Sequence, residues 1–314
     1  MKRALVLGGT GFIGGHLTTF LKEKGYFVRV VDQHVGDYPS DADEIYIKDL
    51  RNDYEALQAF SGHKWDEVYQ LAADMGGMGF IHTNELATLT NNVKINLNCL
   101  EAARIHKAQK YFYSSSVCIY PDMKHGQRAM KEEDAYPALP DNEYGWEKLY
   151  SERLASSYAK TYNMYVRIAR FQNCYGELGT WKGGREKAPA ALCRKIANLK
   201  KGKDIEVWGD GTAVRNFIYV ADLVEAVYML MHSDIDTPVN IGTEEYVTVN
   251  GLVDTIALVA GKSVNKRYID GPVGVESRNF SHEKIRSLGW KPKFTLLEGI
   301  KRTYPWIEKQ VNNS

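Results

Sequence analysis

Cysteine is scarce in this chain, and long apolar runs are missing from it. Its 314 residues include 4 cysteines, at positions 99, 118, 174 and 193. They are too few and too widely spaced for a disulfide scaffold or a zinc site. No stretch approaches the roughly 18 consecutive apolar residues of a membrane span, and the apolar start stops at Gly8 without a leader cleavage site. We expect a reduced, cytoplasmic, globular protein without a metal.

A surplus of either charge is also missing. The chain has 40 Lys+Arg and 39 Asp+Glu, a formal net charge of +1. Proteins that bind nucleic acid or anionic membranes normally carry a basic excess, so neither is an expected partner. With 44% hydrophobic and 25% charged residues, the composition excludes a disordered chain. The length fits one large domain or two coupled ones.

Candidate strands and helices alternate in the first half of the chain. Strands are predicted at residues 3–7, 27–32, 44–47, 67–71 and 110–114, and helices at 11–24 and about 84–106. Strands that alternate with helices are connected by crossovers, which predicts an α/β fold with a doubly wound, parallel, Rossmann-type sheet.

A second, smaller portion is expected where the composition changes near Phe171. Glycine, proline and basic residues become denser from there, which suggests a loop-rich segment. A helix at 219–232 and a strand at 239–241 are predicted to return to the first sheet. We therefore predict a cofactor-binding portion at 1–170 with a returning segment at about 212–242, interleaved with a substrate-binding portion at 171–211 and 243–314.

A glycine-rich turn joins the first predicted strand to the first helix. Residues 8–14 follow the pattern Gly-x-x-Gly-x-x-Gly. Gly8 permits a tight turn, Gly11 lets the backbone approach a pyrophosphate, and Gly14 lets helix and strand pack closely. With Phe12 and Ile13 these residues open a helix whose N-terminus favours phosphate. The turn predicts a dinucleotide site.

An acidic residue decides which dinucleotide is expected. Asp32 ends the second strand, 18 residues after Gly14. A carboxylate there accepts hydrogen bonds from a ribose diol and repels a 2′-phosphate, which favours NAD over NADP. Asp49 and Leu50, after the third strand, are candidates for the adenine edge; a plain surface turn is the alternative.

A tyrosine and a lysine four residues apart form the candidate redox centre. On a helix, Tyr144 and Lys148 share one face. The ammonium is expected to lower the pKa of the phenol and make it a base near neutral pH. Upstream, Ser116 closes a serine cluster after a strand and offers a hydroxyl to a substrate oxygen.

The ordered set of glycine turn, serine cluster and Tyr-x-x-x-Lys resembles the extended short-chain dehydrogenase/reductase family, whose members act on nucleotide-sugars. Three further segments, residues 73–81, 115–121 and 179–189, are similar to the GDP-mannose 3,5-epimerases of that family. The similarity covers nearly the whole chain. It implies permanently bound NAD and a catalytic triad. In this triad Tyr144 is the base for a C4 hydroxyl, Lys148 is its partner and Ser116 is the third member.

The same resemblance implies an acid/base pair, Cys118 and Lys187, that works on carbon-bound protons. Oxidising C4 of a hexose to a ketone acidifies the protons at C3 and C5. A thiolate on one ring face and an ammonium on the other can then remove and return a proton with inversion. Reduction at C4 leaves no net oxidation. The other three cysteines are interpreted as buried hydrophobes.

The nucleotide end of the substrate is assigned to a basic segment. Between Trp181 and Lys203 there are eight basic residues and one acid, Glu186. Such a run is usually a solvated face, yet Lys187, Arg194 and Lys195 share one side of a helix that begins near Pro189, which suits a diphosphate. By resemblance, Trp208, Arg215 and Arg278 contact the nucleotide.

The remaining contacts also come from the resemblance alone. Further cofactor contacts are expected at Leu71, Ala73 and Asn92. Further substrate contacts are expected at Gly77, Met78, Val117 and Asn173. A homodimer through the helices at 84–106 and 144–162 is implied as well.

At two positions the chain departs from the plant members of the family it resembles, which leaves the identity of its substrate open. Gln172 stands where plant members carry histidine, and Glu177 where they carry proline. Epimerisation at C5 alone, action on a heptose, or a 4-keto product are therefore alternatives. So are a GDP-sugar 4-dehydrogenase, a 4,6-dehydratase, and a catalytically silent NAD-binding regulatory protein.

Overall fold

Seven parallel strands form the main sheet of the computed structural model, which describes residues 1–123, 126–200, 202–271 and 279–314. The spatial order is β10-β6-β5-β4-β1-β2-β3. The strands are β1 (Arg3–Leu7), β2 (Phe27–Asp32), β3 (Glu44–Ile47), β4 (Glu67–Gln70), β5 (Lys110–Ser116), β6 (Tyr165–Phe171) and β10 (Val239–Ile241). The order reverses direction between β1 and β4, so the predicted doubly wound α/β fold is confirmed.

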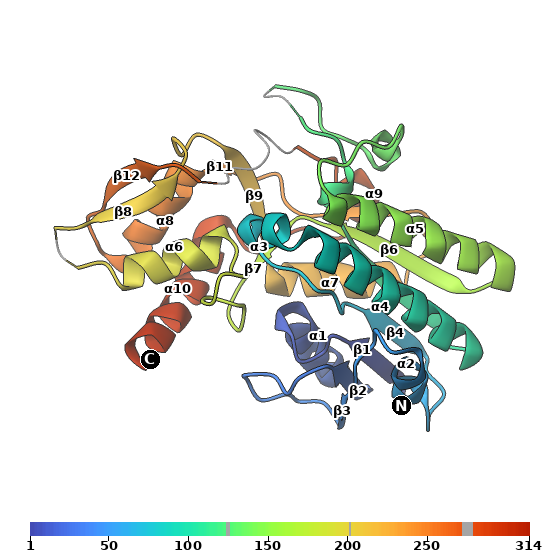
Figure 1. Ribbon diagram of the computed structural model, residues 1–314. Helices are drawn as coiled ribbons and strands as arrows, with labels where there is room; N and C mark the ends of the chain where they lie inside the picture. Colours follow the sequence, from blue (N-terminus) through green and yellow to red (C-terminus); the bar gives the residue numbers. More distant parts are fainter. Residues whose placement is uncertain (124–125, 201, 272–278) are drawn as a thin grey trace.

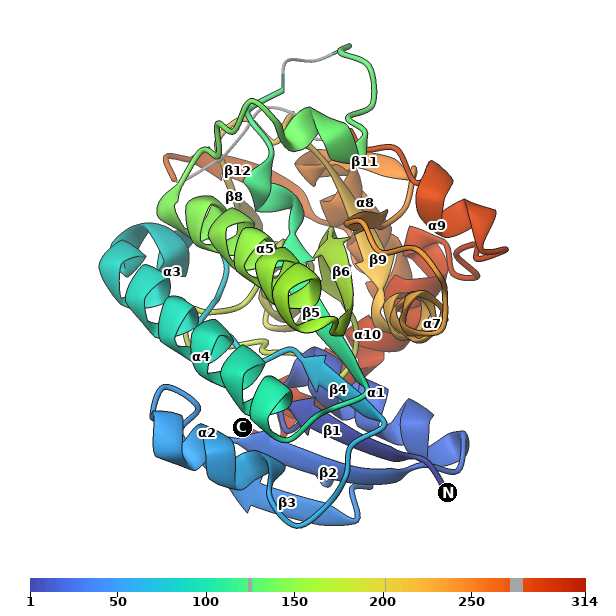
Figure 2. The same ribbon diagram turned by 90° about the vertical axis from the view of Figure 1, so that its right-hand side faces the viewer.

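Helices cover both faces of this sheet (Figure 2). On one face lie α1 (Phe12–Glu23) and α7 (Val220–Met231); on the other lie α2 (Asp53–Phe60), α4 (Glu85–Ile105) and α5 (Glu143–Tyr162). The side chains of β1 alternate between the two layers because strand residues point to opposite faces. Ala4 and Val6 join the core under α1 and α7, while Leu5 and Leu7 join the core under α2 and α4.

The second portion is built from two small sheets with helices packed beside them (Figure 1). One sheet consists of β7 (Asn173–Tyr175), β9 (Val214–Tyr219) and β11 (Tyr246–Thr248), and the other of β8 (Asp204–Trp208) and β12 (Asn265–Ile269). The helices α6 (Ala188–Ala197), α8 (Val249–Ala260) and α10 (Leu296–Asn312) pack against one another. Loops such as residues 176–187 separate these short elements, in the segment that the sequence predicted to be loop-rich.

The chain returns to the main sheet where the sequence predicted it. After α7, β10 pairs in parallel with β6, with Val239 opposite Ala169. The remaining helices are short: α3 (Met78–Thr83), α9 (Glu283–Ser287) and the 3₁₀ turns η1 (Val117–Ile119) and η2 (Glu132–Ala135). Within the part of the chain that is described, no helix has the length and apolarity to cross a bilayer.

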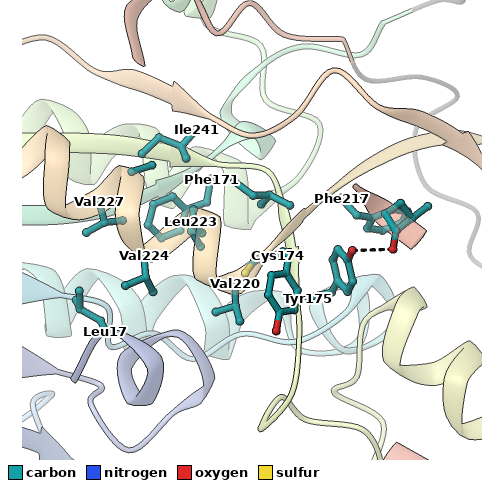
Figure 3. Packing of buried hydrophobic residues seen from close by; sticks show 14 of the residues in the cluster. Leu17, Phe171, Cys174, Tyr175, Phe217, Val220, Leu223, Val224, Val227 and Ile241 are labelled. Carbon is teal, nitrogen blue, oxygen red and sulfur yellow. Dashed lines mark hydrogen bonds between the residues drawn. The ribbon is translucent and has the colours of Figure 1, made fainter. Parts of the chain in front are cut away.

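The apolar face of α7 joins the main sheet to the second portion. Leu223 lies beside the Phe171 ring, whereas Val224 lies on the side of α7 nearer Leu17 of α1 (Figure 3). These residues belong to one buried cluster with Val227 and Ile241. Leu223 is fully buried. This packing fixes β9, which precedes α7, relative to the strand ends of the sheet.

Truncating this contact should destabilise the whole molecule. Leu223→Ala is expected to lower the free energy of unfolding by about 2–5 kcal/mol, because it removes buried methyl groups and leaves a cavity. Leu258→Ala on the solvent side of α8 is the control, with a change within about 0.5 kcal/mol. Urea denaturation followed by circular dichroism measures both, and equal effects would contradict the packing.

Candidate active site

A cleft of about 890 Å³ opens at the carboxyl ends of the main strands, between the two portions of the chain. In doubly wound sheets, ligands bind at this edge near the reversal of strand order. The cleft brings together residues far apart in sequence. Those predicted to bind cofactor or substrate and found in its lining are Gly8, Gly11, Phe12, Ile13, Gly14, Asp32, Asp49, Leu50, Leu71, Ala73, Gly77, Met78, Ser116, Val117, Cys118, Tyr144, Lys148, Asn173, Lys187, Lys195, Trp208 and Arg215.

Two predicted residues are not in that group. Asn92 is buried, and its amide holds the backbone of Asp74, accepting from the Asp74 N–H at 2.6 Å and donating to the Asp74 carbonyl at 3.2 Å. It thus acts on the loop that follows β4 rather than lining the cleft of the described chain. Arg278 lies outside the described residues.

The glycine turn is shaped for a phosphate-bearing cofactor. Gly8 has φ +79°, and its N–H donates to the Val31 carbonyl at 2.7 Å. A Cβ on Gly14 would lie 2.1 Å from the Gly8 oxygen, so α1 could not approach with any larger residue. Gly11 is the N-cap of α1 and has no side chain to cover the first-turn N–H groups. These groups therefore face the cleft as donors for a pyrophosphate.

Asp32 is held at the end of β2 by backbone donors. Its carboxylate accepts from the N–H of Gln33 at 2.8 Å and of Thr10 at 3.3 Å. The contact with Thr10 fixes the carboxylate beside the glycine turn, where a ribose diol would lie. At the far end of the cleft, Asp49 pairs with Arg51 at 2.7 Å, and Leu50 is buried. These residues fit NAD.

The candidate redox centre lies where β5 ends against α5. Ser116 is the N-cap of η1, and its hydroxyl accepts from the Cys118 N–H at 3.2 Å. A Cβ on Gly145 would lie 2.2 Å from the Cys118 carbonyl, so α5 passes directly over this turn. This contact brings Tyr144, one residue earlier on α5, to the same end of the cleft as Ser116 and Cys118.

The second portion supplies cationic groups from the opposite wall. Lys187 is the N-cap of α6. Lys195, two turns on, donates to the Glu206 carbonyl at 2.9 Å and lies 6.0 Å above the Trp208 ring. Arg194 is engaged within the protein, because it pairs with Glu186 at 2.6 Å. Of the basic side chains expected on one face of this helix, all three reach the cleft.

Comparison with known proteins decides the family. Residues 4–242 match the NAD dependent epimerase/dehydratase family. GDP-mannose 3,5-epimerase from Arabidopsis thaliana is 42% identical over 313 residues, covering 98% of this chain and 82% of that protein.

This chain belongs to the NAD-dependent epimerase/dehydratase family.

Solved structures agree with the fold and the cofactor. UDP-glucose 4-epimerase from Thermotoga maritima, solved with UDP-glucose, superposes with a TM-score of 0.90 at 26% identity, over 98% of this chain and 99% of that one. The UDP-glucose 4-epimerase of Thermus thermophilus, in complex with NAD, gives a TM-score of 0.86 at 27% identity, over 97% and 98% of the two chains. The expectation of an NAD-dependent enzyme is confirmed.

The electrostatics of this epimerase/dehydratase site differ from the sequence-based expectation in one respect. Lys148 donates to the Ser114 carbonyl at 3.1 Å and its ammonium lies 5.6 Å from the centre of the Tyr144 ring. Burial nevertheless raises the pKa of Tyr144 well above its usual range, and electrostatic interactions with Cys118 and Glu147 add to the effect. Burial also lowers the pKa of Lys148. Burial therefore acts against the lowering of the Tyr144 pKa that the sequence predicted from Lys148.

A buried carboxyl beneath the redox centre escaped the sequence analysis. Glu147 accepts at one oxygen from the Asn96 amide at 2.7 Å and the Ser151 hydroxyl at 2.9 Å. Its other oxygen has no hydrogen-bond partner in the described part of the chain. Burial raises the pKa of Glu147, and Lys148 is the main opposing influence. The sequence offered one signal, an acid on the buried face of α5 beside a lysine.

A buried ion pair holds the neighbouring strand end. Arg170 on β6 pairs with Glu152 at 2.7 Å, with both side chains almost fully buried. Glu152 also accepts from the Ser115 hydroxyl at 2.5 Å, and Arg170 donates to the Tyr120 hydroxyl at 2.8 Å. The network therefore fixes the backbone on both sides of Ser116 and Cys118.

Replacing the buried carboxyl should alter how stability depends on pH. The fold raises the pKa of Glu147, so the folded state holds this proton more tightly, and that contribution is lost as pH rises through the folded pKa. Glu147→Gln keeps an acceptor for Asn96. Because glutamine does not titrate, the variant does not lose this stability as pH rises. The melting temperature of the variant relative to wild type should therefore rise between about pH 5 and about pH 8.

The control is Glu143→Gln, an exposed acid one turn earlier on α5. The difference in melting temperature between Glu143→Gln and wild type should be the same at both pH values. Differential scanning calorimetry on NAD-loaded protein measures both, and a pH-independent difference for Glu147→Gln would refute the assignment.

Proposed function

We propose that this chain is an NAD-dependent epimerase of a GDP-sugar, with GDP-mannose 3,5-epimerase as the specific activity. The observation that carries the proposal is that one cleft is lined both by Tyr144 with Lys148 and by Cys118 with Lys187. The first pair suits reversible oxidation at C4 and the second suits proton transfer at carbon. The 42% identity to the Arabidopsis enzyme over nearly the whole chain supports this substrate.

In the redox half of the reaction, Tyr144 moves the proton of the C4 hydroxyl. NAD held against the glycine turn and Asp32 would supply reversible hydride transfer at C4. A buried tyrosine of raised pKa is a strong base once ionised, and its phenol form returns the proton to the C4 oxygen. The Ser116 hydroxyl lies at the end of β5, where it can hydrogen-bond the same oxygen. Lys148, held by the Ser114 carbonyl, keeps a positive charge beside the ring.

In the epimerisation half, Cys118 and Lys187 act on carbon. One removes the proton next to the C4 ketone, leaving an enolate, and the other supplies a proton to the opposite face of the same carbon. Inversion requires donors on both sides of the ring, and the two residues come from different walls, η1 and the N-terminus of α6. The same exchange at C5 and then C3 would complete a 3,5-epimerisation.

The remaining residues hold the two ligands. We assign the cofactor to residues 1–170 with the returning segment at about 212–242, and the nucleotide-sugar to 171–211 and 243–314. The strand β9 at the start of the returning segment belongs to a sheet of the second portion, so Arg215 on this strand is assigned to the nucleotide-sugar. Lys195, Trp208 and Arg215 would contact the nucleotide, as would Arg278, which lies outside the described residues. Asn173, Gly77, Met78 and Val117 would surround the sugar.

Deuterium labelling separates this function from its alternatives. GDP-mannose incubated with NAD-loaded protein in deuterated water should gain deuterium at C5 and C3. Cys118→Ala and Lys187→Met should each lower the incorporation rate by about 100-fold or more, and Tyr144→Phe should abolish it, because general acid–base groups contribute about 10²–10⁴. Mass spectrometry and NMR of the products measure deuterium incorporation for wild type and the three variants.

The control is Cys99→Ala, a buried cysteine of α4 outside the cleft, which should label at the wild-type rate. Turnover with unlabelled sugar would exclude an epimerase. Accumulated NADH would indicate a 4-dehydrogenase and loss of water a 4,6-dehydratase. A panel that includes a GDP-heptose tests the effect of Gln172, whose amide nitrogen has no partner within the described residues.

We further propose a cytoplasmic homodimer. The helices α4 and α5 pack side by side and present large apolar side chains to solvent. Leu97, Trp146 and Tyr150 are each between 41% and 49% exposed. A second copy of this surface would cover them with an isologous four-helix contact.

Light scattering tests the dimer. Wild type is expected at twice the 35.6 kDa chain mass. Trp146→Glu combined with Tyr150→Glu should give monomer, because charges in the buried centre of an interface are strongly unfavourable. Leu258→Glu, on the exposed side of α8, should leave the mass unchanged. A wild-type monomer at micromolar concentration would refute the proposal.

A further inference from the structure

Two loops from opposite walls touch across one side of the cleft. Residues 74–80 follow β4, and residues 184–187 precede α6. Asp74 pairs with Arg185 at 2.9 Å, and the Gly77 N–H donates to the Arg185 carbonyl at 3.0 Å. The Arg185 guanidinium also lies 3.8 Å from the centre of the Phe80 ring. We call these four residues the clasp.

The acidic end of the clasp is fixed from behind by α4. The second oxygen of Asp74 accepts from the Asn91 amide at 2.9 Å. The backbone N–H of Asp74 donates to the buried side chain of Asn92 at 2.6 Å. The carboxylate that receives Arg185 is therefore positioned by the main portion of the chain before the second loop docks.

The other end of the clasp leads directly to Lys187. Arg185 precedes it by two residues, and no side chain separates the loops at this point. A Cβ on Gly77 would lie 2.6 Å from the Glu186 carbonyl and 3.8 Å from the Lys187 Cα. Any displacement of Arg185 would therefore move the backbone from which the Lys187 side chain enters the cleft.

We propose that Arg185 is a positioning residue that holds Lys187 in place through Asp74, Gly77 and Phe80. This inference rests on the proposed function of Lys187 in proton transfer. The ion pair is partly exposed, and such pairs add little to global stability. An error of about 1 Å in the position of a reacting group can cost about 100-fold in rate. Loss of the clasp should therefore affect proton transfer at carbon and spare folding.

The test compares two steps of the same reaction in NAD-loaded protein. With GDP-mannose in deuterated water, Arg185→Gln and Asp74→Asn should each lower deuterium incorporation by about tenfold. Transient formation of reduced nicotinamide, which reports C4 oxidation through Tyr144, should change by less than about twofold. The double variant should be no worse than either single one, because the two residues act as a unit.

Two further variants separate position from charge. Gly77→Ala alters no charge but places a Cβ against the Glu186 carbonyl, so it should also lower deuterium incorporation. Arg286→Gln is the matched control: Arg286 pairs with Glu244 at 2.9 Å and is as exposed as Arg185, at 44% against 47%, but it does not line the cleft. It should label at the wild-type rate.

A parallel loss of both steps in Arg185→Gln, or unchanged labelling, would overturn the inference. If wild type incorporates no deuterium, the proposed function fails, and the clasp is then tested by amide hydrogen exchange. Asp74→Asn and Gly77→Ala should accelerate exchange in residues 184–190 relative to Arg286→Gln. Unchanged protection there would show that the clasp does not hold the loop.

Discussion

The close backbone contacts of the glycine turn are the constraint on which the rest of the site depends. A Cβ on Gly8 would lie 2.7 Å from the Ala72 nitrogen, one on Gly9 2.5 Å from the Val30 side chain, and one on Gly14 2.1 Å from the Gly8 oxygen. The turn therefore fits between β1, β2 and the end of β4 only without side chains. This fit brings α1 close to the sheet. Phe12, at the start of α1, then packs against Gly176 and Gly179 of the second portion.

Buried charge shapes the chemistry on the other side of that cleft. Glu152 and Arg170 form a buried ion pair, and Glu152 also accepts a hydrogen bond from Ser115. Together they hold the backbone around Ser116. Glu147 is less well satisfied and lies next to Lys148. Desolvation raises the pKa of Glu147 and lowers the pKa of Lys148. The same low-dielectric surroundings strengthen every charge that a bound substrate and cofactor bring.

Local patterns allowed much of this architecture to be predicted. The alternation of strands and helices, the glycine spacing and Asp32 each depend on a few neighbouring residues, and their elements lie within one or two residues of the predicted bounds. The return of β10 to the sheet was predicted from its place after α7. Beyond Phe171 the sequence predicted the helix that begins near Pro189, but the pairing of the short strands there could not be predicted, because it depends on contacts between distant residues.

The sequence by itself determined which chemical groups are present and the fold that carries them, since periodicity and motif spacing are local properties of the chain. Tertiary structure alone decided which groups meet. Asp74 and Arg185 are 111 residues apart, and their contact depends on how the second portion docks on the sheet. Asn92 faces a loop instead of the cleft because the packing of α4 orients it. The pKa of Tyr144 rises chiefly because of burial, which is a property of the assembled fold and not of the spacing between Tyr144 and Lys148.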